Sequence, residues 1–183
     1  MHRKRFTLTL VIAACGTLLA GGGAAAAIDA PADGGHVFFT AYQNDDLPSA
    51  TAVLSGAIGD FGAAVSVLPN GTVDPEHGSQ FNLALTQGSF RILIGPLHAK
   101  LVSSLSHAPY DSTTCSGHAS VTGAAPVVAG SGTGAYKGIS GSFELTITGN
   151  EVDAKQPNCR PFSGNPLLAQ TIVIAGPGTV SYS

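Results

Sequence analysis

The chain has 183 residues, a formal net charge of −3, 24 glycines and no tryptophan. This length fits one domain with one core. Binding to a nucleic-acid backbone requires clustered Lys and Arg, and beyond residues 3–5 the few basic residues are scattered, so we expect no nucleic-acid partner and no strong membrane adsorption.

Residues 1–27 have the organisation of a secretory signal peptide. Arg3, Lys4 and Arg5 form a basic start, an apolar run covers residues 6–20, and small residues at 25–27 suit cleavage. The apolar run is shorter than the roughly 20 residues that a membrane-spanning helix needs. We therefore predict a secreted, bacterial-type protein with no transmembrane span, made of a signal peptide over 1–27 and a single domain over 28–183.

Residues 12–15, Ile-Ala-Ala-Cys, also resemble a lipobox, where a bacterial lipoprotein is cut before a cysteine that then carries lipid. Cleavage at that point would leave a very short signal. Removal of the peptide together with Cys15 is the favoured interpretation, and lipid anchoring through Cys15 is the alternative.

Short β-prone segments recur about every ten residues after the signal peptide, separated by Gly, Pro, Asn and Asp. Helix signals are nearly absent there. The expected strands are residues 36–42, 50–58, 63–68, 80–86, 89–94, 98–105, 116–122, 126–129, 141–148 and 170–175, some of which must merge. Alternation is clearest at Phe143, Leu145 and Ile147, which share one face of their strand.

Turn signals favour antiparallel pairing of these strands. Gln87-Gly88 is expected to close a hairpin between residues 80–85 and 90–94, and Asn70-Gly71 is a second hairpin signal. An all-β chain of this kind favours a closed antiparallel eight-stranded β-barrel, because closure removes exposed strand edges. A β-sandwich is the alternative.

Cys115 and Cys159 remain after cleavage, and thiols pair in an oxidising compartment. We predict a disulfide between them, which by the chain-entropy argument stabilises the fold by roughly 4 kcal/mol. A thiolate nucleophile or a metal pair is the rival interpretation, although no CxxC spacing supports it. The bond would pin a long loop over residues 152–166.

The densest glycine segment is residues 132–141, with glycines at Gly132, Gly134, Gly138 and Gly141. Such glycines permit positive φ and close strand approach, so we interpret the segment as a structural turn at a barrel corner. Its spacing misses the dinucleotide-binding motif by one residue, and a strand rather than a helix follows it. We therefore expect no bound nucleotide.

Residues 115–117, the glycine segment and residues 143–148 together resemble secreted bacterial members of the allene oxide cyclase and dirigent barrel superfamily. Residues 56–62 and the Asn70-Gly71 turn resemble it more weakly. The resemblance implies an eight-stranded barrel with a ligand inside it and dimeric or trimeric assembly. Some members cyclise an unstable epoxide or steer radical coupling, but their polar pocket residues have no dependable match in this chain.

Five charged residues are candidates for catalysis, because a carboxyl group in a barrel mouth acts as an acid or base when burial raises its pKa. They are Asp45, Asp46, Asp60, Glu144 and the cation Arg91. A solvated turn before Pro48 is the favoured interpretation for Asp45 and Asp46. Alternation with Phe90 and Ile92 favours a water-facing Arg91.

Tyr42 and His77 are candidates for ligand binding. His98, His107 and His118 lie on neighbouring expected strands without a metal-binding spacing, so we expect no metal and no cofactor. The function we expect is that of a secreted, non-enzymatic barrel that binds a small apolar ligand or a partner. The alternative is an isomerase or cyclase that confines a reactive intermediate, and the oligomeric state stays open.

Overall fold

A computed structural model gives the structure of the chain and describes residues 34–44, 49–75, 77–105, 107–154, 159 and 166–183. The predicted signal peptide, with Cys15, and the pair Asp45 and Asp46 lie outside these ranges. In the described residues no helix is long and apolar enough to cross a membrane.

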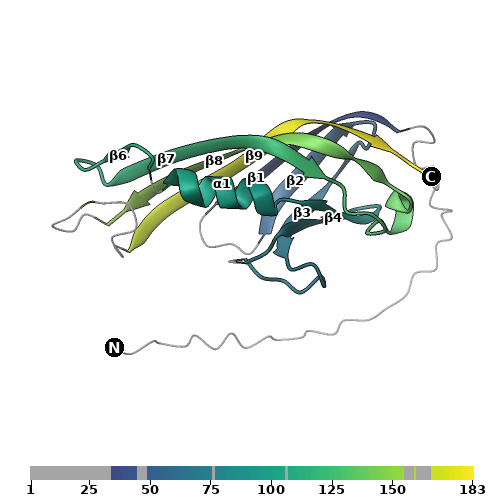
Figure 1. Ribbon diagram of the computed structural model, residues 1–183, viewed down its shortest axis with the longest axis horizontal. Coiled ribbons are helices and arrows are strands. Elements are labelled where there is room, and N and C mark those ends of the chain that lie inside the picture. Colours follow the sequence, from purple (N-terminus) through teal and green to yellow (C-terminus); the bar gives the residue numbers. More distant parts are fainter. Residues whose placement is uncertain (1–33, 45–48, 76, 106, 155–158, 160–165) are drawn as a thin grey trace, which may run out of the picture.

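In the described residues, one antiparallel sheet of nine strands forms the body of the molecule (Figure 1). The strands follow the order β5-β4-β3-β2-β1-β9-β8-β7-β6. Their bounds are β1 Gly35–Asn44, β2 Ser49–Gly56, β3 Asp60–Val67, β4 Gln80–Leu85, β5 Gly88–Leu93, β6 Tyr110–Asp111, β7 Ser116–Pro126, β8 Ser140–Asp153 and β9 Leu167–Ser181. The chain is mostly β, as predicted, and the β4–β5 hairpin is confirmed, with Leu85 paired to Gly88 around the turn.

The closed eight-stranded barrel is wrong, because the sheet curls into an open half-barrel. In the described residues its two edges meet at a single isolated bridge between Ile92 and Val127, beside a 2.8 Å bond from the Val128 amide to the Arg91 carbonyl. Val127 directly follows β7, and in the described residues β5 does not pair with β7 itself. The β-sandwich alternative is also wrong, because all nine strands of the described residues belong to one sheet.

A helix stands where the sequence suggested a strand over residues 98–105. Helix α1, Gly95–Leu105, follows β5 directly and packs against β7. Leu97 and Leu101 lie four residues apart on one helix face, and both pack into the core cluster. The helix therefore covers part of the opening between the two sheet edges (Figure 1).

The core lies on the inward face of the sheet. Phe143, Leu145 and Ile147 point inward and are buried, as their alternation predicted, whereas Glu144 is exposed. Phe39 meets Phe143 edge-on at 6.1 Å between ring centroids. The resemblance places a ligand inside the barrel, and in this structure apolar side chains pack together there.

The glycine segment forms the connection between β7 and β8. It contains the short 3-10 helix η1, Gly134–Tyr136, and positive φ angles at Gly134, Gly138 and Gly141. A Cβ at Gly132 would collide with the Tyr136 carbonyl oxygen. This tight path carries Tyr136 into the core against Phe90, with 5.3 Å between the ring centroids.

Candidate functional site

A groove of about 770 Å³ lies between α1 and β7. Its size is that of ligand sites in other proteins. The helix contributes Pro96, Ala99, Lys100, Ser103 and Ser104, the following loop contributes His107, Ala108 and Pro109, and the strand contributes His118, Ala119 and Ser120. Many of these residues are exposed, so the groove is open to solvent along its length.

The position of α1 follows from a few local contacts. The amides of Ile94 and Gly95 both donate to the Ser79 carbonyl at 2.9 Å, which fixes the start of the helix. Buried Leu97 then lies over Gly123, where a Cβ would be only 3.3 Å from the Leu97 Cδ2 atom. Because Gly123 has no side chain, the helix approaches β7 closely, and its polar flank borders the groove.

In the described residues, the edge of β7 that points away from β8 is unpaired over much of its length. The Val127 amide donates to the Gly141 carbonyl, so odd-numbered residues of β7 direct their backbone groups toward β8. Even-numbered residues therefore point the other way, and the Thr122 carbonyl accepts a 3.4 Å bond from Lys100 Nζ. Within the described part of the chain, no strand pairs with His118 or Ser120 on this side.

The titratable groups that line the groove are all basic. They are Lys100, His107 and His118, and no carboxylate is among the described residues that line the groove. His107 Nδ1 lies 3.0 Å from the Ser103 carbonyl, which only accepts, so Nδ1 carries a proton. His118 Nδ1 contacts Asn150 Oδ1 at 2.7 Å. The groove is thus neutral to positive on a chain of net negative charge, which favours an anionic ligand.

A second hollow of about 550 Å³ continues from the groove at Pro109 and His118. It differs in charge, because Asp111 and Glu151 are among its lining residues. Burial raises the pKa of Glu151, and the nearby charge of Asp153 raises it further. The two hollows therefore form one continuous depression that is basic beside α1 and acidic beside β6.

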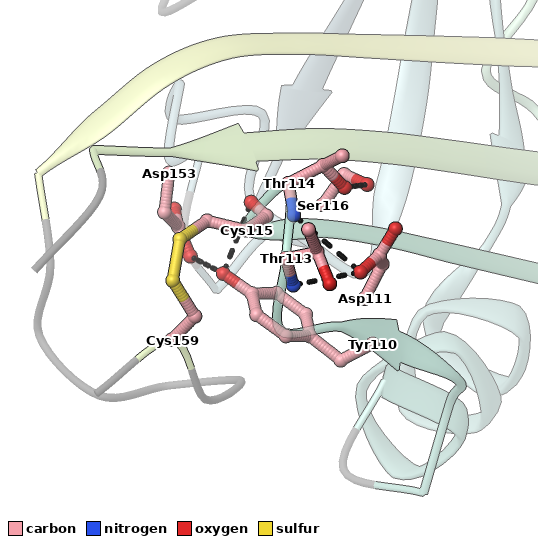
Figure 2. Close-up of a disulfide and its surroundings, with 8 residues drawn as sticks. All are labelled: Tyr110, Asp111, Thr113, Thr114, Cys115, Ser116, Asp153 and Cys159. Carbon is pink, nitrogen blue, oxygen red and sulfur yellow. Dashed lines mark hydrogen bonds between the residues drawn. A yellow bond between two sulfur atoms is a disulfide. The ribbon is translucent and has the colours of Figure 1, made fainter. Parts of the chain in front are cut away.

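The predicted disulfide between Cys115 and Cys159 is confirmed, with 5.1 Å between the Cα atoms. Figure 2 shows it beside Tyr110, whose hydroxyl donates to Asp153 Oδ2 at 2.6 Å. This bond, followed by burial, raises the pKa of Tyr110 to about 12. The Asp153 amide in turn donates to the Cys115 carbonyl at 2.8 Å. These contacts hold β6 and the end of β8 around the acidic hollow.

Asp60 is buried, with 4% of its surface exposed, and lines neither hollow. Its carboxylate accepts bonds from the hydroxyls of Thr86 and Tyr136, both at 2.5 Å, and from three backbone amides. Burial alone would raise the Asp60 pKa, but the hydrogen bonds outweigh it and the pKa is lowered. Asp60 therefore joins β3, the β4–β5 turn and η1, which is a structural role.

The other predicted site residues are dispersed. Arg91 Nη1 donates to the Pro69 carbonyl at 2.8 Å, and Glu144 lies near His36 in a separate hollow of about 340 Å³. Tyr42 is half-exposed on the outward face of β1, and His77 Nδ1 lies 3.3 Å from Asp74 Oδ1 on the surface. No two of Asp60, Arg91 and Glu144 are hydrogen-bonded to each other in the described residues.

Sequence reasoning missed the groove because it missed the helix. His107 and His118 do meet along one groove, but His98 is not among its lining residues. In the described residues no three His, Cys, Asp or Glu side chains gather as metal ligands would. The signal that was available is Pro96, which suits a first helical turn, followed by leucines at positions 97, 101 and 105.

Comparison with protein-family models, with curated proteins and with solved structures finds no match for this chain. The resemblance to the allene oxide cyclase and dirigent superfamily therefore stays a prediction.

Proposed function

We propose that the protein is an exported, non-enzymatic binding protein whose groove takes an extended acidic segment of a partner chain. The segment adds to the free edge of β7 as a further strand. The observation that carries this proposal is the unpaired edge at His118 and Ser120. This edge borders a groove that is lined by basic residues and, on the side of α1, by Pro96 and Ala99.

Strand addition uses the two chemical features of the groove together. Backbone groups of His118 and Ser120 supply main-chain hydrogen bonds, which give affinity without regard to sequence. Side chains of the added strand alternate, so one set faces α1, where Pro96 and Ala99 offer apolar contact and Lys100 a positive charge, while the other set points away from the helix. Because the groove is open along its length, an extended segment fits it better than a small apolar molecule, which binds best when largely enclosed.

A direct test uses a fluorescein-labelled peptide of alternating valine and glutamate, followed by fluorescence anisotropy at low ionic strength. A peptide of alternating valine and lysine is the control. We expect the acidic peptide to bind and the basic one not to bind, with affinity falling as salt is added, because surface charges are screened. Equal binding of both peptides, or binding of neither, contradicts the proposal.

Two pairs of variants locate the site. Ser120→Pro removes an amide that points away from β8, so it leaves the β7–β8 ladder intact, and Ser120→Ala removes only the hydroxyl. We expect Ser120→Pro to weaken peptide binding at least about tenfold and Ser120→Ala to leave it nearly unchanged. Lys100→Gln should weaken binding, whereas Lys137→Gln, which removes the same charge outside the groove, should not. Wild-type binding by a folded Ser120→Pro variant overturns strand addition.

A further inference from the structure

The outward face of the sheet carries an apolar patch over β3, β2, β1 and β9. Phe61 is 62% exposed and Phe38 48%, and Tyr42 and Val53 are exposed to a similar degree. Strand register puts them on one face, because Phe61 pairs with Val53, and Val53 pairs with Thr40 between Phe38 and Tyr42. On the β9 side of β1, Pro177 and Val173 continue the same face.

This outward patch has no charged residue among the described positions. Thr51, Ala63 and Ala175 separate the large side chains, so the surface alternates projecting rings with shallow positions. Contiguous exposed apolar surface on a soluble chain marks an interaction site, and the centres of protein interfaces are rich in aromatic and poor in charged residues. The four strands are paired on both sides, so a partner must stack on the face rather than add to an edge.

We infer that two copies of this chain associate face to face through the outward patch. The net charge of each copy is negative, so like copies repel over most of their surface, and this neutral face is where they meet without repulsion. A two-fold contact also lets the rings of one copy fill the shallow positions of the other, because such contacts use the same patch on both copies.

The size of the patch predicts a weak, reversible dimer. Four strands spaced about 4.8 Å apart and about eight residues long present a face of about 19 by 27 Å. Stacking two such faces buries on the order of 1,000 Å² in total, which is the lower limit for specific association. We therefore expect dissociation at micromolar rather than nanomolar concentration.

Sedimentation velocity on the mature chain, from about 1 to about 500 µM, measures the association. We expect a monomer–dimer equilibrium in the wild type. Val53→Asp places a charge near the centre of the patch and should raise the dimer dissociation constant at least about tenfold. Val73→Asp is the matched control, because Val73 is exposed to a similar degree but lies outside the patch, and it should change the constant by less than about twofold.

Phe61→Ser, which removes apolar area without adding charge, is the second variant and should also weaken the dimer. Far-UV circular dichroism checks that each variant is folded. A wild type that stays monomeric at every concentration overturns the inference, as does a dimer that Val53→Asp and Phe61→Ser leave unchanged. A monomer that instead floats with phosphatidylcholine vesicles overturns self-association and assigns the patch to a lipid surface.

Discussion

The Tyr136 hydroxyl donates a hydrogen bond to the Asp60 carboxylate, although the two residues are 76 positions apart in the sequence. Tyr136 is 2% exposed and Asp60 4%, so both partners lie inside the core. The bond ties the glycine segment to the first residue of β3. It therefore holds together two parts of the half-barrel that no strand pairing joins.

Tyr136→Phe should lower the free energy of unfolding by about 1.5–3 kcal/mol, because a buried hydrogen bond to a charged group is lost. Asp60→Asn should lower it more, since an amide nitrogen cannot accept the bonds that reach the Asp60 oxygens. Urea unfolding measures both changes. Glu144→Gln is the control, because that exposed carboxyl should contribute less than about 0.5 kcal/mol.

The Asp60 contribution should depend on pH in a definite direction. Its pKa is lowered in the folded state, so its stabilisation is fully present above the unfolded value of 3.8 and is lost as pH falls through the folded pKa. The difference in unfolding free energy between the wild type and Asp60→Asn should be largest near neutral pH and shrink below about pH 4. A difference that stays constant down to pH 2.5 excludes an ionised, hydrogen-bonded Asp60.

Most of the strands, though not the short β6, were predictable because alternation and turn residues are local signals. Phe143, Leu145 and Ile147 mark the inward face of β8 without reference to the rest of the chain, and the β4–β5 hairpin follows from one short turn. The roles of Asp60 and Tyr136 were not predictable, because each partner is distant in sequence. The sequence pattern of an aspartate at the start of an apolar strand is the same whether its carboxylate is solvated or buried.

Helix α1 and the open edge were missed for a related reason. A short segment such as residues 98–105 fits a strand or a helix by its local pattern, and in the folded chain the helix packs Leu97 against Gly123. Whether a sheet closes depends on whether its two edges meet in space. In this chain β5 and β7 meet near Ile92 and then diverge beside the helix, so the groove follows from contacts that no local pattern specifies.

The glycine segment offers a second test of the fold. Gly132→Ala should lower the free energy of unfolding by more than about 2 kcal/mol, because the new Cβ collides with the backbone at Tyr136. Gly149→Ala is the matched control in β8, where a Cβ meets nothing within 4 Å. It should be neutral or slightly stabilising, because alanine reduces the freedom of the unfolded chain. Urea denaturation of the two variants measures the contrast, and similar losses would contradict the tight turn.

The disulfide should account for a large part of the stability. Cys115 and Cys159 are 44 residues apart, and closing a loop of that length stabilises a fold by roughly 4 kcal/mol in the chain-entropy model. The double variant Cys115→Ser, Cys159→Ser should therefore unfold at much lower denaturant than the oxidised wild type. Reduced wild type is the control and should behave like the double variant. A reduced protein as stable as the oxidised one would show that the bond contributes little.

Leu97 anchors α1 through its contact with Gly123 of β7, and the groove depends on this contact. Leu97→Ala should lower the free energy of unfolding by about 2–5 kcal/mol, because it leaves a cavity between the helix and β7. It should also speed hydrogen exchange over residues 95–105 more than over β8, since the helix has no other deeply buried anchor among its described side chains.

The control variant is Val102→Ala, which removes a half-exposed side chain from the same helix and should change stability by less than about 0.5 kcal/mol. Equal effects of the two variants on exchange would mean that α1 is held by its connections to β5 and β6 rather than by packing on β7, and the wall of the groove would then not depend on the Leu97–Gly123 contact.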